Sequence, residues 1–237
     1  MAEKWINEAE AVDPTKQTIE NSAKLYSAMR EFMKAKKCDA ITTDCGTLMI
    51  SGYLPAYPCL AFFEMAKQAI VGCCESDMDS TISHLFGLYV AHRPGFVSNY
   101  SIDLSHGNIV YLHCVASNRP FGTEGPSAGY YIKHHGESHF MGASPLIEFP
   151  TDEDVTTIKI SVLEKKMLIR SGKSVGFLVD DNGCRNKLLV RSETRKVLEN
   201  HDFKTFGWHT VSFFGDLRKE FESAAKLLGL EVVEEDK

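Results

Sequence analysis

The residue pattern changes at Arg93-Pro94-Gly95, and this change limits the folds that the chain can adopt. Before this point, short buried runs alternate with helical patterns, which is typical of an open, mostly parallel α/β sheet. After it, as far as about residue 214, short β-type runs dominate and turn signals separate them. Many short strands with regular turns predict an antiparallel barrel or sandwich. We therefore expect an α/β part over residues 1–92, followed by a β-barrel with a C-terminal helix over residues 93–237.

The first part contains too few elements for a complete α/β domain. Asp13-Pro14 is expected to open the first clear helix, with Asp13 as its N-cap, and the helix continues to about Lys36. Two buried strands are predicted over 38–43 and 69–74, and further helices over 60–68 and directly after Glu75-Ser76-Asp77. Residues 1–92 thus resemble the end of a larger α/β domain. Either the chain is a fragment, or this part packs tightly against the barrel.

The second part is expected to consist mainly of strands. The predicted strands are 96–102, 109–115, 130–133, 145–149, 156–162, 175–179, 187–191 and 209–214. A helix from about Leu217 to Leu228, ended by Gly229, and a short strand over 230–233 are expected to close the chain.

Composition argues against several classes of protein. Of the 237 residues, 43% are hydrophobic and 24% are charged, and the formal net charge of −6 comes without a basic block that could neutralise phosphates, so we expect no nucleic-acid partner. No apolar run approaches the roughly 20 residues needed to cross a bilayer. Seven cysteines without a CxxC pair or a signal peptide indicate free, mostly buried thiols. The expected location is the cytoplasm.

Two carboxylates follow the predicted parallel strands. Asp44 comes after the first strand and Glu75 after the second, where ligands bind in open α/β sheets. A carboxylate at such a helix entrance could hold a cation or move a proton. The alternative is that Glu75-Ser76-Asp77 only caps the following helix, a role that fits Asp77 better than Glu75.

Two histidines stand alone in apolar strands. His113 lies within 109–115, and His209 begins 209–214. A single strand histidine is more often a hydrogen-bonded core residue than a ligand. Together with a carboxylate at a strand end, however, two buried imidazoles would suit Mn²⁺, Zn²⁺ or Fe²⁺. The spacing of these residues does not establish that they converge.

Two further groups are candidates for substrate contacts. His134, His135 and His139 are expected on a surface loop, with a substrate-contacting role for His135. Arg185 precedes a strand and could hold an anionic or polyhydroxyl ligand, although a solvated turn explains it equally well. The sequence contains no nucleophile elbow, Walker loop, GxGxxG, HExxH or kinase signature, so hydrolysis has no motif in its favour.

Several segments, taken in order, resemble one known family. They include Cys74-Glu75-Ser76-Asp77, Arg93-Pro94-Gly95-Phe96, Leu112-His113-Cys114 and Trp208-His209-Thr210-Val211, together with 38–45, 57–61, 183–187, 215–217 and 227–233. Their order and spacing resemble the C-terminal half of the L-fucose isomerase and L-arabinose isomerase superfamily, in particular its fucose-isomerase-like branch. The resemblance covers nearly the whole chain.

This resemblance implies a fold and a reaction. Enzymes of the family have two α/β domains before a C-terminal β-barrel, so this chain would keep the end of the second domain and the barrel. They are metal-dependent aldose–ketose isomerases that bind Mn²⁺, with other divalent metals possible, and act through an enediol on an open-chain monosaccharide. By position, Glu75, His113 and His209 correspond to metal ligands, and Glu75 also to a catalytic base. The family also implies a homo-oligomer, a trimer or hexamer, or a separate chain that carries the missing α/β domains.

One departure from the family pattern affects the expected chemistry. A second carboxylate should follow the Arg-Pro-Gly-Phe turn, where this chain has Ser98 and Asn99. Asp103 and Asp77 are the nearest candidates for the second acid/base. Loss of one of two general bases can lower the rate by about a hundredfold or more. The alternative function is therefore a catalytically impaired sugar-binding or assembly module of the same fold, and a metallohydrolase is a weaker third possibility.

Overall fold

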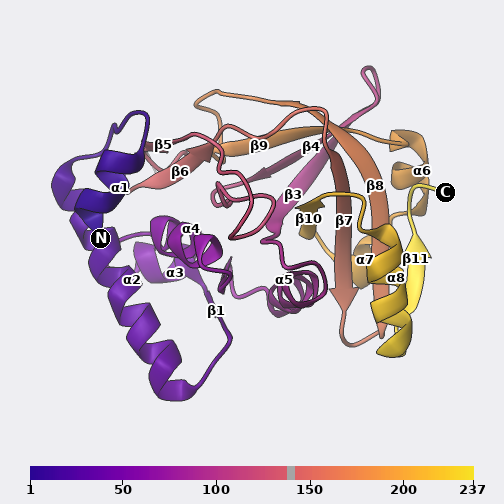
Figure 1. Cartoon of the computed structure of the whole chain (residues 1–237), viewed down its shortest axis with the longest axis horizontal. Helices are drawn as coiled ribbons and strands as arrows, with labels where there is room; N and C mark the ends of the chain where they lie inside the picture. Colours follow the sequence, from indigo (N-terminus) through magenta and orange to yellow (C-terminus); the bar gives the residue numbers. More distant parts are fainter. Residues whose placement is uncertain (138–141) are drawn as a thin grey trace.

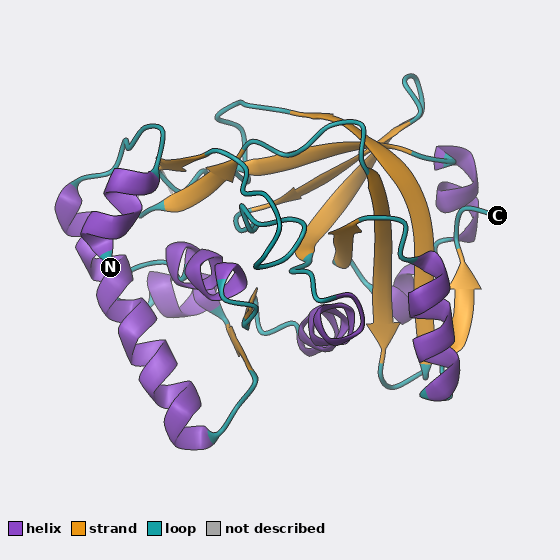
Figure 2. Ribbon diagram, in the orientation of Figure 1, coloured by secondary structure: helices purple, strands orange, loops and turns teal. Residues whose placement is uncertain are grey.

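Six antiparallel strands form a closed barrel in the second part of the chain. The computed structural model describes residues 1–137 and 142–237. The strand order is β8-β7-β10-β3-β4-β9, and β9 pairs back to β8. The bounds are β3 Phe96–Asp103, β4 Asn108–His113, β7 Asp154–Ser161, β8 Lys166–Phe177, β9 Asn186–Arg191 and β10 Thr210–Phe214. The predicted antiparallel barrel is thereby confirmed, and Figures 1 and 2 show its strands in the right half of the view.

The barrel closes through one long strand that the sequence predicted only in part. The first half of β8 pairs with β7, and its second half pairs with β9 after an irregularity between Ser174 and Gly176. Such a bulge bends a strand and increases its twist. The prediction placed a strand only at 175–179. Residues 167–170, which include Arg170, are buried on both faces of the strand. Segment 166–173 therefore lacks the alternation of apolar and polar residues that predicts a half-buried strand.

Helices and one extra strand cover the end of the barrel. These are α6 Thr194–Asn200, α7 Phe203–Phe206, α8 Arg218–Leu227 and β11 Glu231–Glu234. The predicted C-terminal helix and strand are confirmed, whereas α6 and α7 were not predicted. β11 runs parallel to β8 and adds a seventh strand to the sheet. Gly229 follows α8 with a positive φ of 71°, a conformation that glycine adopts without steric cost.

The α/β part contains a short parallel sheet. It consists of β1 Ala40–Thr43 and β2 Val71–Cys74, with the helices α1 Ala2–Glu8, α2 Lys16–Lys36, α3 Cys45–Ile50, α4 Cys59–Lys67 and α5 Met78–Ala91. The two predicted strands are confirmed as a parallel pair, and α4 and α5 both pack against β2. Figure 1 shows α5 between the helices α1–α4 and the barrel strands. One hydrophobic core runs through both parts and includes Trp5, Phe62, Ile109 and Val190.

The predicted start of the long helix was wrong. The long helix begins at Lys16, and its N-cap is Thr15, whose side chain accepts a hydrogen bond from the Thr18 amide. Asp13 instead donates its amide to the Ile132 carbonyl and pairs with Lys133 at 3.0 Å. The N-terminal segment is thus tied to a distant strand, which local helix signals cannot indicate. Helices α1 and α3 were also not predicted.

Two strands that were expected in the barrel form a separate sheet. Among the strands that the structure describes, β5 Tyr130–Lys133 and β6 Ser144–Ile147 pair with each other and with no other strand. Asn186 joins them to the barrel, because its side chain accepts from the Ile147 amide and donates to the Pro145 carbonyl. Within the described ranges 1–137 and 142–237, each helix is too short or too polar to cross a membrane.

A buried ion pair anchors the C-terminal segment to the barrel. Arg170 is 1% exposed and donates to Glu235 at 2.6 Å, to Tyr111 at 2.8 Å and to Thr210 at 3.1 Å. Its guanidinium also lies 4.2 Å from the ring centroid of Tyr100. A buried charge is tolerated only when it is paired and hydrogen-bonded. Arg170 therefore links three barrel strands to the end of the chain.

Glu235→Ala should lower the free energy of unfolding by about 3–5 kcal/mol, because it leaves the Arg170 charge buried without its carboxylate. Denaturant unfolding measures the change. Glu231→Ala is the control, since Glu231 is an exposed residue of β11, the strand just before Glu235, and its pair with Lys166 is long at 3.8 Å. The effect of this substitution should stay below about 1 kcal/mol. Equal effects of the two substitutions would contradict the role of this ion pair.

Candidate metal centre

The ends of β1 and β2 place two carboxylates at one edge of the parallel sheet. Thr43 pairs with Cys74, so Asp44 and Glu75 leave the sheet at the same level. Glu75 and Ser76 both have left-handed backbones, with φ of 65° and 55°. This conformation is unfavourable for residues other than glycine and persists only where surrounding contacts impose it. Here the Ser76 amide donates to the Thr43 carbonyl at 3.0 Å, which fixes the turn that leads from β2 into α5.

Glu75 lies between two buried imidazoles. Its Oε1 is 3.3 Å from His113 Nε2, and its Oε2 is 3.6 Å from His209 Nε2. His113 is the last residue of β4, and His209 directly precedes β10. One ligand atom from each of the three side chains lies within 4.8 Å of the others. The hydrogen bond from His113 outweighs burial and keeps the pKa of Glu75 below its usual value, so the carboxylate is ionised at neutral pH.

Asp77 holds His209 in a defined orientation. The Asp77 carboxylate caps α5 by accepting from the Ser80 amide at 2.8 Å, and it lies 2.9 Å from His209 Nδ1. Lys159 donates to it at 3.0 Å. Burial would raise the pKa of Asp77, but the bond from His209 and the charge of Lys159 outweigh it and hold that pKa far below the usual range. The ionised Asp77 carboxylate can only accept, so His209 donates through Nδ1 and its Nε2 is the ring nitrogen that faces Glu75.

Lys159 also belongs to this arrangement, although it was not among the predicted site residues. Lys159 lies in the middle of β7 and is 3% exposed. A lysine is almost never buried without an anionic partner. The sequence of β7 is DVTTIKIS, in which Lys159 alternates with Ile158 and Ile160 as a solvent-facing residue would, so its burial and its partner Asp77 both depend on the tertiary structure.

The three side chains fit a divalent cation. Two ligand atoms that share an ion at about 2.1 Å lie about 3.0–3.4 Å apart at octahedral or tetrahedral angles, close to the observed 3.3 and 3.6 Å. His209 Nε2 is buried and has no hydrogen-bond partner among the described residues. A metal-bound imidazole usually donates a hydrogen bond from its other ring nitrogen to a carboxylate, as His209 does to Asp77. Imidazole and carboxylate ligands suit Mn²⁺, Fe²⁺, Co²⁺ or Zn²⁺.

A cleft of about 570 Å³ opens beside Glu75 and His113, and Asp44, Tyr57 and His135 also line it. The ring of His135 stacks on Tyr57, with 4.3 Å between the centroids. Burial lowers the pKa of His135 to about 4, so its imidazole is neutral at physiological pH. The cleft can therefore offer both an aromatic surface and polar groups to a ligand.

The structure does not bring the other candidate residues to Glu75. Asp103 lies at the exposed turn between β3 and β4, where Ser105 and then His106 hydrogen-bond to it and lower its pKa to about 2. It pairs with Asn108, at the opposite end of β4 from His113. Arg185 is buried, donates to the His134 carbonyl in the loop after β5 at 2.6 Å, and pairs with Asp181. His139 lies outside the described residues.

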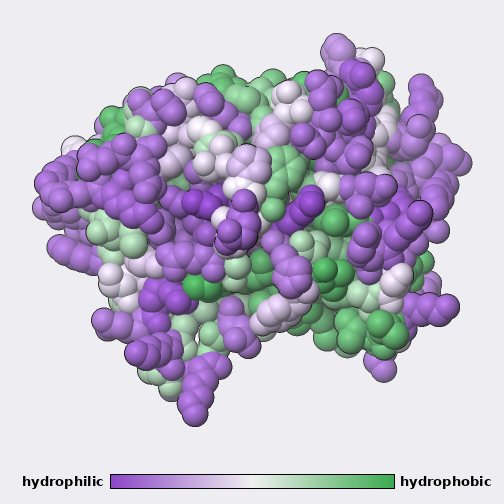
Figure 3. Space-filling model, in the orientation of Figure 1, coloured by the Kyte–Doolittle hydropathy of each residue, from purple (hydrophilic) through white to green (hydrophobic). Residues whose placement is uncertain are grey.

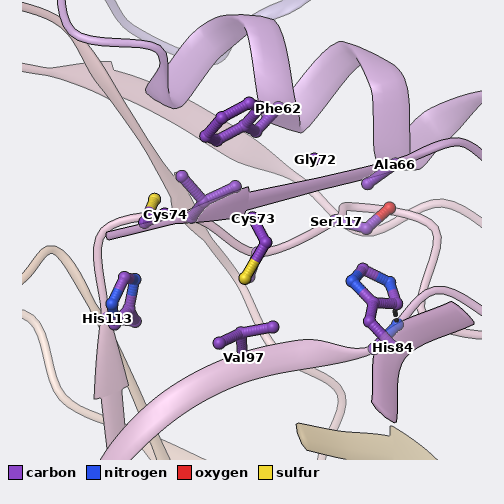
Figure 4. A pocket seen from close by; sticks show the side chains of 12 residues that line it. Phe62, Ala66, Gly72, Cys73, Cys74, His84, Val97, His113 and Ser117 are labelled. Carbon is purple, nitrogen blue, oxygen red and sulfur yellow. Dashed lines mark hydrogen bonds between the residues drawn. The ribbon is translucent and has the colours of Figure 1, made fainter. Parts of the chain in front are cut away.

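Another buried histidine, His84, has a structural role. His84 on α5 accepts a hydrogen bond from the Gly95 amide at 2.8 Å through Nε2. Figure 4 shows His84 and His113 on opposite sides of a cavity of only about 20 Å³, room for about one water molecule. Burial lowers the pKa of His84 to about 4. Its neutral ring therefore fixes the turn at Gly95, where the chain enters the barrel.

No protein-family model matches this sequence. The chain is 21% identical, over 244 aligned positions, to a sulfoquinovose isomerase from Alkalicoccus urumqiensis. The alignment covers 98% of this chain and 54% of that protein, so the chain spans about half the length of the curated relative it matches. The comparison supports a sugar-isomerase-like relationship, in agreement with the coarser part of the expectation from the sequence. Membership of the L-fucose and L-arabinose isomerase superfamily stays a prediction.

Glu75→Gln, His113→Ala and His209→Ala should each lower stoichiometric binding of Mn²⁺, because each removes one ligand. Asp77→Asn should weaken binding by roughly 10–100-fold, since carboxylates that orient a metal-bound histidine contribute about this much. Loss of the free-Mn²⁺ signal in electron paramagnetic resonance measures binding. His106→Ala, in the exposed turn after β3, is the control. If the control loses Mn²⁺ while the other variants keep it, the site is elsewhere.

His84 should make the free energy of unfolding depend on pH. Its pKa is lower in the folded chain, about 4, than its ordinary value of 6.5, so protons bind the unfolded chain more tightly. The contribution of His84 to the free energy of unfolding is fully present above about pH 6.5, and it falls by about 3 kcal/mol as the pH is lowered to 4. Denaturant unfolding of wild type and His84→Gln across this range measures the difference. Parallel pH curves for the two proteins would contradict this assignment.

Proposed function

We propose that this chain carries the metal-binding and proton-transfer centre of an aldose–ketose isomerase that acts on an open-chain monosaccharide. The observation that carries the proposal is the convergence of Glu75, His113 and His209 beside a cleft that is large enough for a sugar. The distant similarity to a sulfoquinovose isomerase supports the same class of reaction. The resemblance to the L-fucose and L-arabinose isomerase superfamily supports Mn²⁺ as the cofactor, although other divalent ions fit the same ligands.

Glu75 would have two roles in this reaction. One carboxylate oxygen would bind the cation, while the ionised carboxylate moves the proton between C1 and C2 of the sugar. When bound, a divalent ion would polarise the sugar carbonyl and stabilise the negative charge that develops as the C2 proton leaves. His113 and His209 would complete the ligand set with neutral imidazoles, and Asp77 would keep His209 in the required orientation.

The cleft supports recognition of a polyhydroxyl ligand. Tyr57 and the neutral ring of His135 form a stacked aromatic wall, against which the C–H face of a sugar could lie. Asp44 lines the same cleft and can accept hydrogen bonds from hydroxyl groups. We propose that His135 contacts the substrate and that Arg185 supports it indirectly, because Arg185 holds the carbonyl of the neighbouring His134.

A catalytically impaired sugar-binding or assembly module is the second candidate. The family pattern requires a second carboxylate where this chain has Ser98 and Asn99, and Ser98 is completely buried. Asp103 is remote from Glu75, and Asp77 is already engaged by His209 and Lys159. A chain with one acid/base group could retain metal and sugar binding and turn over slowly.

Self-association would suit either candidate. Leu163 in the β7–β8 turn, and Leu227 and Leu228 at the end of α8, are exposed. In Figure 3 hydrophilic side chains cover most of the visible face, and a hydrophobic area lies at its lower right edge, near the end of α8 in Figure 1. Exposed apolar groups of this kind often mark association surfaces. We propose a homo-oligomer, a trimer or hexamer, or association with a separate chain that carries further α/β domains.

The isomerase proposal is tested by incubating the Mn²⁺-loaded protein with a panel of aldoses, among them fucose, arabinose and sulfoquinovose, and detecting ketose by nuclear magnetic resonance. Turnover is expected with at least one sugar, and Glu75→Gln should lower it by roughly a hundredfold or more because the base is lost. Glu164→Gln, in an exposed turn, is the matched control.

The absence of ketose with every sugar would overturn the catalytic proposal. Calorimetry would then decide the second candidate, since sugar affinity without turnover is its expected result. Light scattering of the same sample measures association, and a monomer at micromolar concentration would contradict self-assembly.

A further inference from the structure

A second group of potential metal ligands lies beside the first. Cys114 directly follows β4, Cys184 precedes β9, and Glu137 lies in the loop after β5. One ligand atom from each of these three side chains lies within 4.8 Å of the other two. Cys114 and Glu137 line the same cleft as Glu75. The three residues lie more than 20 positions apart in the sequence, so the tertiary structure brings them together.

The distances match those of a tetrahedral metal site. The Glu137 carboxylate accepts from the Cys184 thiol at 3.3 Å and from the Cys114 thiol at 3.7 Å. Around a zinc ion with bonds of about 2.3 Å to sulfur and 2.0 Å to oxygen, a sulfur and an oxygen ligand lie about 3.5 Å apart. The three side chains would therefore need little rearrangement to bind one ion.

Tight packing between two loops holds this cluster in place. Gly136 lies so close to Gly183 that a Cβ atom at Gly136 would be 1.9 Å from the Gly183 carbonyl oxygen. This contact places Glu137 next to Cys184. Cys114 is held equally firmly, because its carbonyl accepts from Ser144 at 2.6 Å and from Asn186 at 3.2 Å. Both thiols are about 95% buried and neither forms a disulfide.

We propose that Cys114, Glu137 and Cys184 form a second metal site, for a thiophilic divalent ion such as Zn²⁺. Two thiolates and one carboxylate select a softer ion than the nitrogen and oxygen ligands of the Glu75 site. Each thiol releases its proton to solvent when it binds. A tetrahedral ion has a fourth position, which here faces the cleft and would take water.

This second site would fix one wall of the cleft. It would join the end of β4 to the loop after β5 and to the loop before β9, three segments that otherwise meet through Asn186, Ser144 and Arg185. His113 and Cys114 are neighbours in the sequence, so one strand end would supply a ligand to each of two sites. The proposal does not depend on isomerase activity, because its ligands differ from those of the Glu75 site.

Titration of the full, reduced chain with Co²⁺ tests the proposal. Thiolate ligation produces a sulfur-to-cobalt charge-transfer absorption in the near ultraviolet, whereas the Glu75 site contains no sulfur and cannot contribute to it. We expect the band to appear and saturate, to be lost in Cys184→Ser and Cys114→Ser, and to be displaced by Zn²⁺. His209→Ala and Cys38→Ser should keep it, since the first alters only the Glu75 site and the second an exposed cysteine elsewhere.

Glu137→Gln keeps the test decisive if a cysteine variant does not fold, because Glu137 is exposed and both thiols remain. The Glu137→Gln substitution should weaken Co²⁺ binding by at least roughly tenfold. Even substitutions of residues that only hydrogen-bond to a metal ligand commonly have effects of this size. A thiol assay first establishes that all seven cysteines are reduced. The proposal would be overturned if the reduced wild type showed no charge-transfer band. It would also be overturned if Cys184→Ser kept the full intensity of the band and Glu137→Gln kept the full affinity for Co²⁺.

Discussion

The candidate site depends on the contacts of one group, the Asp77 carboxylate. It caps α5 in the α/β part, accepts from Lys159 on β7, and hydrogen-bonds His209 beside β10. Three separate elements thus meet at one charged group. Asp77 and Lys159 are both largely buried, and the loss of either would leave the other charge without its partner, which is strongly unfavourable in a protein interior. The same contacts orient the imidazole that faces Glu75.

The backbone around Glu75 reinforces this arrangement. Two consecutive left-handed residues at Glu75 and Ser76 end β2 abruptly and start α5. Such conformations persist only where surrounding contacts compensate for them. Here the compensation comes from the Ser76 amide bond to Thr43 and from the Asp77 cap. The turn places Glu75 at the boundary between the parallel sheet and the barrel, where both histidines can reach it.

The barrel supplies rigid positions from which short polar segments reach the cleft. His113 and Cys114 lie at the end of β4, Cys184 lies just before β9, and His209 just before β10. Because β4 pairs with β9, the ends that carry Cys114 and Cys184 are adjacent. The two ligand clusters thus result from strand pairing. The pairing of β4 with β9 brings Cys114 and Cys184 together, whereas β4 and β10 flank β3, so that His113 and His209 lie at about the same level of that strand. The α/β part contributes Glu75, while the separate β5–β6 hairpin contributes Glu137.

Local chemistry in the sequence determined several features of this protein. The parallel strands, Glu75 at a strand end, Asp77 at the entrance of α5, and most of the antiparallel strands follow from burial patterns and turn residues that act over a few positions. Only the tertiary structure decided which of these residues meet. The burial of Lys159 and its pairing with Asp77 could not be recognised locally, since Lys159 alternates with isoleucines as a solvent-facing residue would. Asp103 was a candidate by sequence distance, although hairpin pairing carries it to the far end of β4. The separation of β5 and β6 from the barrel escaped prediction for the same reason. Strand pairing, buried ion pairs and ligand convergence join residues tens of positions apart, and such contacts form only when the whole core is assembled.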